Sequence, residues 1–212
     1  MLEELKKIVC KNNLELPKHG LVVMTSGNVS GRDPESNLVV IKPSGVDYEK
    51  LRPEDMVVVD LNGNKVEGEL KPSVDTESHL YIYRHRSDIY GVCHTHSTYA
   101  SVFAALGKPI PACLTTTAML GGEVPLGEFI AVGGSKIGKE IIENIGDKKA
   151  ILMKNHGVFT IGNNAAQATK MAIEVEEIAK ITYFALLLGD PIMLTNEQIK
   201  IFKNIYENMY GQ

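Results

Sequence analysis

Residues 56–67, MVVVDLNGNKVE, decide the fold class of this chain. Met56–Val59 is rich in valine, which favours strands, and Lys65–Glu67 follows it after the turn Asn62-Gly63-Asn64. Asparagine followed by glycine readily adopts the positive φ angles of a tight hairpin turn. We therefore predict a β-hairpin here, and a sheet that is at least partly antiparallel.

Outward from this hairpin, apolar runs and helix signals follow one another without strict alternation. Further strands are predicted at residues 21–24, 38–41, 89–93, 129–132, 150–153 and 158–161. Helices are predicted at residues 2–13, 73–86, 99–106, 135–146 and 163–189, and a capping-box match at Thr195 and Gln198 opens a last helix. Because strands and helices do not alternate, we predict one α/β domain over residues 1–212, with a largely antiparallel central sheet and helices packed on both sides.

The composition is that of an ordinary globular protein: 212 residues, 44% hydrophobic and 23% charged, with a net charge of −4. The lack of a basic block argues against nucleic acid as a partner, and no apolar run approaches the roughly 20 residues that span a membrane. The first residues given lack the long apolar core and the small-residue cleavage site typical of a secretory signal. The three cysteines are widely spaced, with no CxxC pair. We therefore expect a cytoplasmic protein.

The stretch Cys93-His94-Thr95-His96-Ser97 follows a predicted strand. Side chains two residues apart in an extended chain project to the same face, so His94 and His96 can bind one metal ion. His156 lies in a turn between two apolar strands and can supply a third imidazole. Each histidine alone could have an ordinary structural role. Three of them, with an open position for substrate, form the arrangement found in catalytic zinc sites. We predict zinc, which another divalent metal such as Mn²⁺ or Co²⁺ could replace. The remaining histidines are expected on the surface or on helix faces: His19, His79 and His85.

Three turns are candidates for holding a phosphate group. Thr25–Gly31 and Lys42–Gly45 each follow a predicted strand, and Lys71–Ser73 precedes a predicted helix, whose N-terminal amides favour an anion. All three contain small hydrogen-bonding residues. Any one of them is most often an ordinary turn, but their positions at strand ends and at a helix start allow them to form a joint phosphate pocket.

Asp75 stands in the first turn of the predicted helix that follows Ser73. It can be a helix cap stabilised by the helix dipole, or a carboxylate near the metal that acts as general base or extra ligand. Glu77 is the competing acid in the same turn. Tyr210, close to the end of the chain, is a candidate proton donor, although a tyrosine in a tail usually has no such role.

Taken together, these motifs resemble the class II aldolase/adducin family, which includes L-fuculose-1-phosphate aldolase and L-ribulose-5-phosphate 4-epimerase. The resemblance runs nearly end to end, and its motifs are specific in combination. They are Gly27-Asn28-Val29-Ser30, Lys42-Pro43-Ser44-Gly45-Val46, Lys71-Pro72-Ser73, His94-Thr95-His96, Asn155-His156-Gly157 and Tyr210-Gly211-Gln212.

The resemblance implies a role for each of these positions. It implies a zinc site at His94, His96 and His156, with Asp75 as a base that can touch the zinc. It implies a homotetramer with active sites at the subunit interfaces, where Tyr210 comes from the neighbouring chain. The substrate is then a small sugar phosphate whose phosphate is bound by Asn28, Ser44, Gly45 and Ser73.

Two departures from the family pattern bear on the reaction. Val74 stands where family members usually have a second serine, so one phosphate-binding hydroxyl is lost. Met119 stands where the epimerases have an aspartate, and Thr115 where the fuculose-phosphate aldolases have a tyrosine. Neither proton donor of the family is therefore present between residues 115 and 120.

The activity that the resemblance implies is that of a zinc-dependent sugar-phosphate aldolase of the L-fuculose-1-phosphate type. Such an enzyme cleaves a ketose phosphate by retro-aldol chemistry through a metal-bound enediolate, giving dihydroxyacetone phosphate and an aldehyde. L-Ribulose-5-phosphate 4-epimerase is the alternative, favoured by Asp75, by residues 40–48 and by the Tyr-Gly-Gln end. An epimerase needs acid–base groups on both faces of the aldehyde, so Met119 favours the aldolase, as does the chain length.

Two further alternatives belong to the same family. A non-catalytic assembly module, like the adducin head domain, could lose its metal-binding histidines without penalty, whereas this chain has all three. A decarboxylase or dehydratase would exploit the same metal-stabilised enolate, and the sequence barely separates it from an aldolase.

Overall fold

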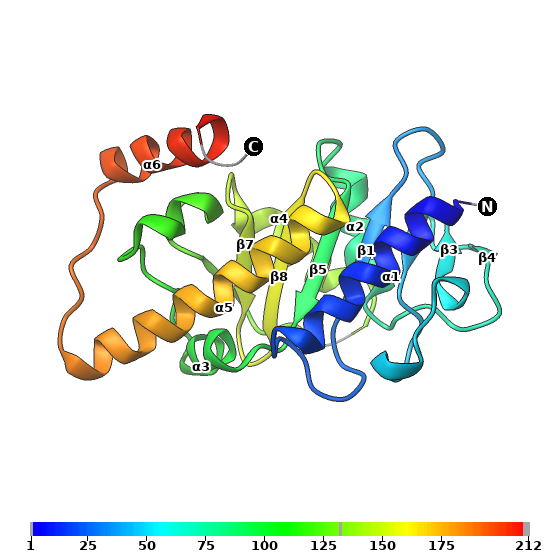
Figure 1. Ribbon diagram of the computed structural model, residues 1–212, viewed down its shortest axis with the longest axis horizontal. Coiled ribbons are helices and arrows are strands. Elements are labelled where there is room, and N and C mark those ends of the chain that lie inside the picture. Colours follow the sequence, from blue (N-terminus) through cyan, green and yellow to red (C-terminus); the bar gives the residue numbers. More distant parts are fainter. Residues whose placement is uncertain (1, 132, 210–212) are drawn as a thin grey trace.

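The computed structural model describes residues 2–131 and 133–209, and its centre is one eight-stranded sheet (Figure 1). The strand order is β4-β3-β2-β1-β5-β8-β7-β6, and every neighbouring pair is antiparallel except β6 and β7. This confirms the predicted α/β fold with a largely antiparallel sheet. The strands are β1 (Asn28–Arg32), β2 (Val39–Ile41), β3 (Val57–Val59), β4 (Lys65–Glu67), β5 (Gly91–Thr95), β6 (Leu126–Gly127), β7 (Ala150–Met153) and β8 (Gly157–Gly162).

Helices cover both faces of the sheet, as predicted. In Figure 1, α1 and α5 cross the near face, and α2 and α4 lie behind the strands. The helices are α1 (Glu3–Lys18), α2 (Thr76–His85), α3 (Thr98–Leu106), α4 (Lys136–Ile145), α5 (Ala165–Leu188) and α6 (Asn196–Asn208), with short 3-10 helices η1 (Tyr48–Lys50), η2 (Pro53–Asp55) and η3 (Thr115–Leu120).

Strand β3 of the valine-rich hairpin is buried on both faces of the sheet. Val57 and Val59 contribute to the hydrophobic core beneath α2 and α4, whereas Val58 points to the opposite core beneath α1 and α5. Successive side chains of a strand alternate between faces, so a strand covered on both sides needs apolar residues at every position. This explains the unbroken valine run, which then turns into the exposed edge strand Lys65–Glu67.

Two predicted strands are wrong. Residues 21–24 form no strand: Leu21 is buried against the α1 side of the core, but the backbone turns at Met24, whose φ is 56°. The strand starts instead at Asn28, inside the segment that was predicted as an anion-binding turn. Residues 129–131 also lie outside any strand, and Phe129 is 60% exposed. In both places the sequence contains an apolar run, but those residues do not pair with a strand of the sheet.

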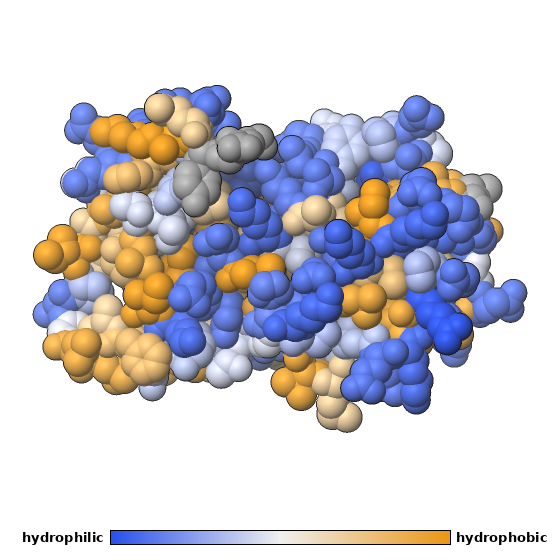
Figure 2. Space-filling view, viewed as in Figure 1, coloured by the Kyte–Doolittle hydropathy of each residue, from blue (hydrophilic) through white to orange (hydrophobic). Residues whose placement is uncertain are grey.

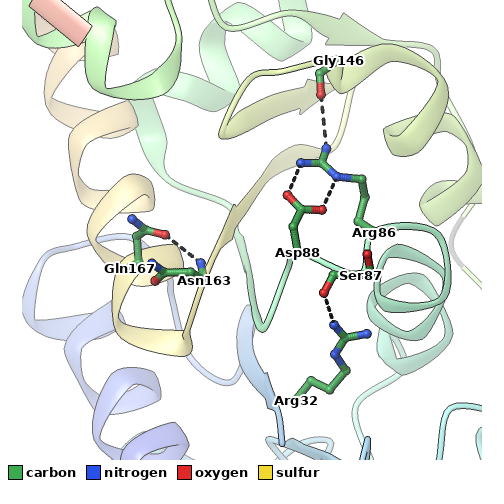
Figure 3. A network of polar contacts seen from close by, with 7 residues as sticks. All are labelled: Arg32, Arg86, Ser87, Asp88, Gly146, Asn163 and Gln167. Carbon is green, nitrogen blue, oxygen red and sulfur yellow. Dashed lines mark hydrogen bonds and ion pairs between the residues drawn. The ribbon is translucent and has the colours of Figure 1, made fainter. Parts of the chain in front are cut away.

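A polar network fixes the connection between α2 and β5 (Figure 3). Arg86 donates two hydrogen bonds to Asp88, at 2.8 and 2.7 Å, and one to the carbonyl of Gly146 at 3.2 Å. Arg32 of β1 donates to the carbonyl of Ser87 at 2.7 Å. These bonds hold the short segment between the end of α2 and the start of β5 against β1 and the end of α4. Among the helices of residues 2–131 and 133–209, none combines the length and the apolar character of a membrane span.

Candidate active site

A pocket of about 310 Å³ opens at the end of the sheet where β1 begins and β5 ends. Five short segments meet there: the loop before β1, the turn after β2, the start of α2, the end of β5 and the β7–β8 turn. Eight residues predicted for the site line this one pocket: Asn28, Ser44, Gly45, Ser73, Asp75, His94, His96 and His156. Tyr210, the ninth, lies outside the described residues.

Three imidazoles converge at one side of the pocket. His94 is near the end of strand β5, His96 follows that strand, and His156 sits in the β7–β8 turn, where the amide of His156 donates to the carbonyl of Met153 at 3.0 Å. One nitrogen from each ring lies within 4.8 Å of the others. The Nε2 atoms of His94 and His96 are 3.0 Å apart.

This cluster fits a divalent metal ion. Two nitrogens each bound at about 2.0–2.1 Å in a tetrahedral site are roughly 3.3 Å apart, close to the separation of the His94 and His96 nitrogens. The other nitrogen of His94, Nδ1, lies 2.9 Å from the carbonyl of Val158, to which it must donate. That bond leaves the Nε2 lone pair free for a metal, which is the usual way in which a second partner orients a metal-binding histidine.

The protonation of the histidines also suits a metal. Burial lowers the pKa of His94 to about 3 and lowers the pKa of His96 and His156 from their ordinary values. Metal binding requires neutral imidazoles. The three rings are therefore already in the protonation state that a metal needs at neutral pH.

Asp75 is the buried carboxylate of the pocket. It precedes the first residue of α2 and is 8% exposed, and its Oδ2 accepts a hydrogen bond of 2.7 Å from the side-chain amide of Asn28. Burial raises the pKa of Asp75, but attraction to His94 and His79 and the hydrogen bond from Asn28 outweigh it, so the net pKa is lowered. Asp75 is therefore ionised at neutral pH and able to accept a proton.

Two turns held together form a further part of the pocket lining. The amide of Ser44 donates to the carbonyl of Lys71 at 2.9 Å, and the amide of Ser73 donates to the carbonyl of Lys42 at 3.0 Å. Asn28 also donates to the hydroxyl of Ser73, at 3.1 Å. These contacts bring the predicted phosphate turns side by side, although the sequence separates them by about thirty residues.

Lys42 was not among the predicted site residues, yet it lines the pocket. It is 2% exposed, and its ammonium donates to the carbonyl of Thr25 at 3.1 Å. Burial lowers its pKa from the ordinary lysine value. The signal was present in the sequence, because Lys42 opens one of the three predicted anion turns.

Three further features that the sequence singled out lie outside the pocket lining: His79, Glu77 and the segment 115–120. His79, expected on the surface or on a helix face, lies on α2 and is fully buried, with Nδ1 2.7 Å from the hydroxyl of Ser30. Glu77, the competing acid, forms an ion pair with Arg84. The segment 115–120 forms η3, which contacts α5 and α6, and none of its residues lines the pocket.

Comparison with known proteins gives the same class as the fold and the site. The family model described as "Class II Aldolase and Adducin N-terminal domain" matches residues 7–183. A solved L-fuculose 1-phosphate aldolase is 34% identical, with a TM-score of 0.92, over 96% of this chain and 96% of that chain. The chain therefore belongs to the class II aldolase/adducin family, whose aldolases depend on a metal ion.

Two further solved structures are similar. One is YgbL from Klebsiella pneumoniae, described as a candidate aldolase/epimerase/decarboxylase, at 25% identity and a TM-score of 0.85 over 95% of this chain and 99% of that chain. The other is an L-fuculose-1-phosphate aldolase from Thermus thermophilus, at 25% identity and a TM-score of 0.74 over 88% of this chain and 98% of that chain.

Proposed function

We propose that this chain is a zinc-dependent sugar-phosphate aldolase that cleaves a ketose 1-phosphate such as L-fuculose 1-phosphate. The products are dihydroxyacetone phosphate and an aldehyde. One observation carries the proposal: a three-histidine cluster, a buried carboxylate and two anion-type turns line the same pocket. Similarity to a solved L-fuculose 1-phosphate aldolase over nearly the whole chain supports it.

The metal-binding end of the pocket would hold the carbonyl end of the substrate. A divalent ion bound by His94, His96 and His156 supplies a Lewis acid for the ketose carbonyl. The hydrogen bond between His94 and the carbonyl of Val158 keeps the ring in place during turnover. The pocket thus fixes where negative charge develops when the C3–C4 bond breaks.

Asp75 is the proton carrier in this proposal. Cleavage removes the proton of the C4 hydroxyl, breaks the C3–C4 bond and leaves its electron pair on C3, which then takes up a proton. A single base can accept the first proton and return it to C3, so Asp75 alone would satisfy the proton balance when no second donor takes part. Asn28 holds Asp75 by the 2.7 Å hydrogen bond and so fixes the orientation of its carboxylate.

The phosphate would lie at the other end, against Asn28, Ser44, Gly45 and Ser73. Gly45 has a φ of 69°, and a β-carbon added there would meet nothing within 4 Å, so its backbone borders open space in the pocket. Backbone amides and hydroxyls at such turns and at the start of α2 favour an anion. Val74 replaces one serine of the family pattern, and its side chain is 67% exposed.

The second candidate is L-ribulose-5-phosphate 4-epimerase, which Asp75 and residues 40–48 favour. The epimerase must protonate and deprotonate both faces of the aldehyde. Residues 115–120 carry neither the aspartate nor the tyrosine of the family patterns. Because an aldolase needs fewer acid–base groups than an epimerase, this loss is easier to reconcile with an aldolase.

We also propose a homotetramer with active sites at the subunit interfaces, where Tyr210 of a neighbouring chain would serve as proton donor. Apolar side chains gather at one end of the molecule, over α6 and the C-terminal half of α5 (Figure 2). Leu187 is 65% exposed, and Leu188 and Ile192 are 91% and 90% exposed. Burying them between chains would support such an assembly, and light scattering of the purified protein measures its size.

The function is tested by incubating the zinc-loaded protein with L-fuculose 1-phosphate and, separately, with L-ribulose 5-phosphate. Release of dihydroxyacetone phosphate from the first substrate, detected by a coupled reduction, is the expected result. Clean conversion of the second substrate to D-xylulose 5-phosphate, with no cleavage of the first, would contradict it. Metal-free protein treated in parallel is the control for contaminating enzymes.

A further inference from the structure

Tyr48, at the start of η1, lies behind the loop that forms one wall of the pocket. Its side chain is buried, with 6% of its surface exposed, and it is not part of the pocket lining. The hydroxyl is 2.8 Å from the carbonyl oxygen of Ser26 and 3.0 Å from that of Gly27. One phenolic proton is therefore shared between two successive carbonyls of the loop.

These contacts determine which way the loop's peptide groups face. In a trans peptide the C=O and the following N–H point in opposite directions, and no cis peptide is found in the described residues. Holding the carbonyl of Ser26 toward Tyr48 turns the amide N–H of Gly27 away from it. Gly27 itself has a φ of 75°, and a β-carbon there would lie 2.4 Å from Val22 Cγ1, so the loop has little freedom to adjust.

The face of the Tyr48 ring also contacts a charged group that lines the pocket, the ammonium of Lys42. The ammonium of Lys42 lies 4.7 Å from the centre of the Tyr48 ring, within the range of a cation–π contact. Lys42 also donates to the carbonyl of Thr25, in the same loop. Tyr48 thus contacts both the backbone and the cation that border the anion end of the pocket.

We propose that Tyr48 is a positioning residue of the anion end: its hydroxyl fixes the Ser26–Gly27 backbone and its ring fixes the Lys42 ammonium, so that both are prearranged for a phosphate group. Tyr48 touches no substrate atom in this arrangement. The inference deepens the proposed function, because it concerns how the same pocket binds the phosphate of its substrate. A purely structural Tyr48 would contribute to folding but not to phosphate affinity.

Tyr48→Phe removes the hydroxyl and keeps the ring, whereas Tyr48→Leu removes both. For zinc-loaded protein we expect Tyr48→Phe to raise the Kd of inorganic phosphate about tenfold, the effect of one lost hydrogen bond of ordinary strength. Tyr48→Leu should raise it further. With L-fuculose 1-phosphate as substrate, KM should rise while kcat changes little, and zinc content should stay at the wild-type value.

Tyr83→Phe is the matched control, because Tyr83 is a buried tyrosine whose hydroxyl lies 2.8 Å from that of Ser30, in strand β1, and makes no contact with the Ser26–Gly27 backbone. It should leave the Kd of phosphate unchanged. An unchanged Kd in Tyr48→Phe, or equal increases in both variants, would overturn the proposal. Failure of the protein to cleave either sugar phosphate would refute the proposed function, while the Kd of inorganic phosphate would still decide the role of Tyr48.

Hydrogen exchange on the wild-type protein keeps the test decisive if Tyr48→Phe does not fold. Saturating inorganic phosphate should slow exchange of the Gly27 amide, which Tyr48 turns away from itself. Exchange at Gly27 that does not respond to phosphate would count against the inference. The amide of Gly63, in the hairpin turn and outside the pocket lining, serves as the internal reference.

Discussion

His94 and His96 meet at 3.0 Å because the side chains of an extended chain repeat every two residues. This is a local property, so the sequence alone is enough to predict the pair. His156 is different: it reaches the pair only because β8 lies beside β5 in the sheet. The sequence offered it as a candidate through its position in a turn between two apolar strands, and the structure places it in the same cluster.

His96→Ala should abolish both zinc binding and turnover, because two imidazoles are left to hold an ion that needs at least three protein ligands in catalytic sites. Metal analysis of the purified variant, together with the cleavage assay, measures both effects. His85→Ala is the control, since His85 is exposed and stacks on Tyr81 away from the pocket. Stoichiometric zinc in His96→Ala would show that this residue is not a ligand.

Asp75→Asn should keep most of the zinc but lower kcat by roughly 10²–10⁴-fold, the usual contribution of a positioned base. Asparagine has the same shape, and its side-chain oxygen can still accept the hydrogen bond from Asn28. Glu77→Gln should leave kcat near the wild-type value, because Glu77 is paired with Arg84. The reverse pattern in the two variants would move the base from Asp75 to Glu77.

His79 should make the stability of the metal-free protein depend on pH. Burial lowers its pKa from 6.5 to about 4 in the folded state and lowers the pKa of His94 to about 3, so between these values the unfolded chain binds protons that the folded chain does not. The free energy of unfolding should therefore be highest above pH 6.5 and fall by a few kcal/mol toward about pH 4. Urea unfolding across this range measures it, and a flat profile would be inconsistent with a buried neutral His79.

At the scale of elements, the structure confirms strands and helices with strong local patterns and differs where burial comes from an unexpected partner. The Asn-Gly hairpin and the Thr195–Gln198 capping box form as predicted, since their determinants lie within a few residues. Leu21 looks like a strand residue, but α1 and its neighbours bury it without a sheet. Asn28 looks like part of a turn, but pairing with β5 makes it the start of a strand.

The start of β8 should tolerate no side chain at Gly157. A β-carbon there would lie 2.4 Å from the carbonyl oxygen of Thr95 and 2.8 Å from Cδ2 of His96. Gly157→Ala should therefore push β8 away from β5, lower the unfolding midpoint and weaken zinc binding together. Gly189→Ala, where a β-carbon meets nothing within 4 Å, should do neither. Wild-type zinc affinity in Gly157→Ala would contradict the tight packing described here.

At the scale of the whole molecule, the site depends on residues from position 28 to position 156 that only the sheet brings together. The sequence could suggest the metal end, the anion turns and Asp75 separately. It could not show that Ser44 and Ser73 are joined through bonds to Lys71 and Lys42, because such contacts depend on the tertiary fold. For the same reason the sequence did not identify Lys42 as a pocket residue or show that the helix face carrying His79 is fully buried.

Removing the metal should destabilise the whole protein, because the ion would join β5 to the β7–β8 turn. A ligand at 1,000 times its Kd stabilises the folded state by about 4 kcal/mol. A chelator should therefore lower the thermal midpoint, and added zinc should restore it, as differential scanning fluorimetry can follow. Protein that neither contains nor takes up zinc would favour a non-catalytic assembly module instead.

The two edge strands of the sheet affect how readily copies of this chain aggregate at high concentration. Strand β4 has three residues, with Lys65 and Val66 exposed, and β6 at the other edge has two. Short edges, one of them bearing charge, are poor templates for strand addition by another chain. Both edge strands of the central sheet thus disfavour open-ended fibril growth, even though its central strands are among the most apolar parts of the molecule.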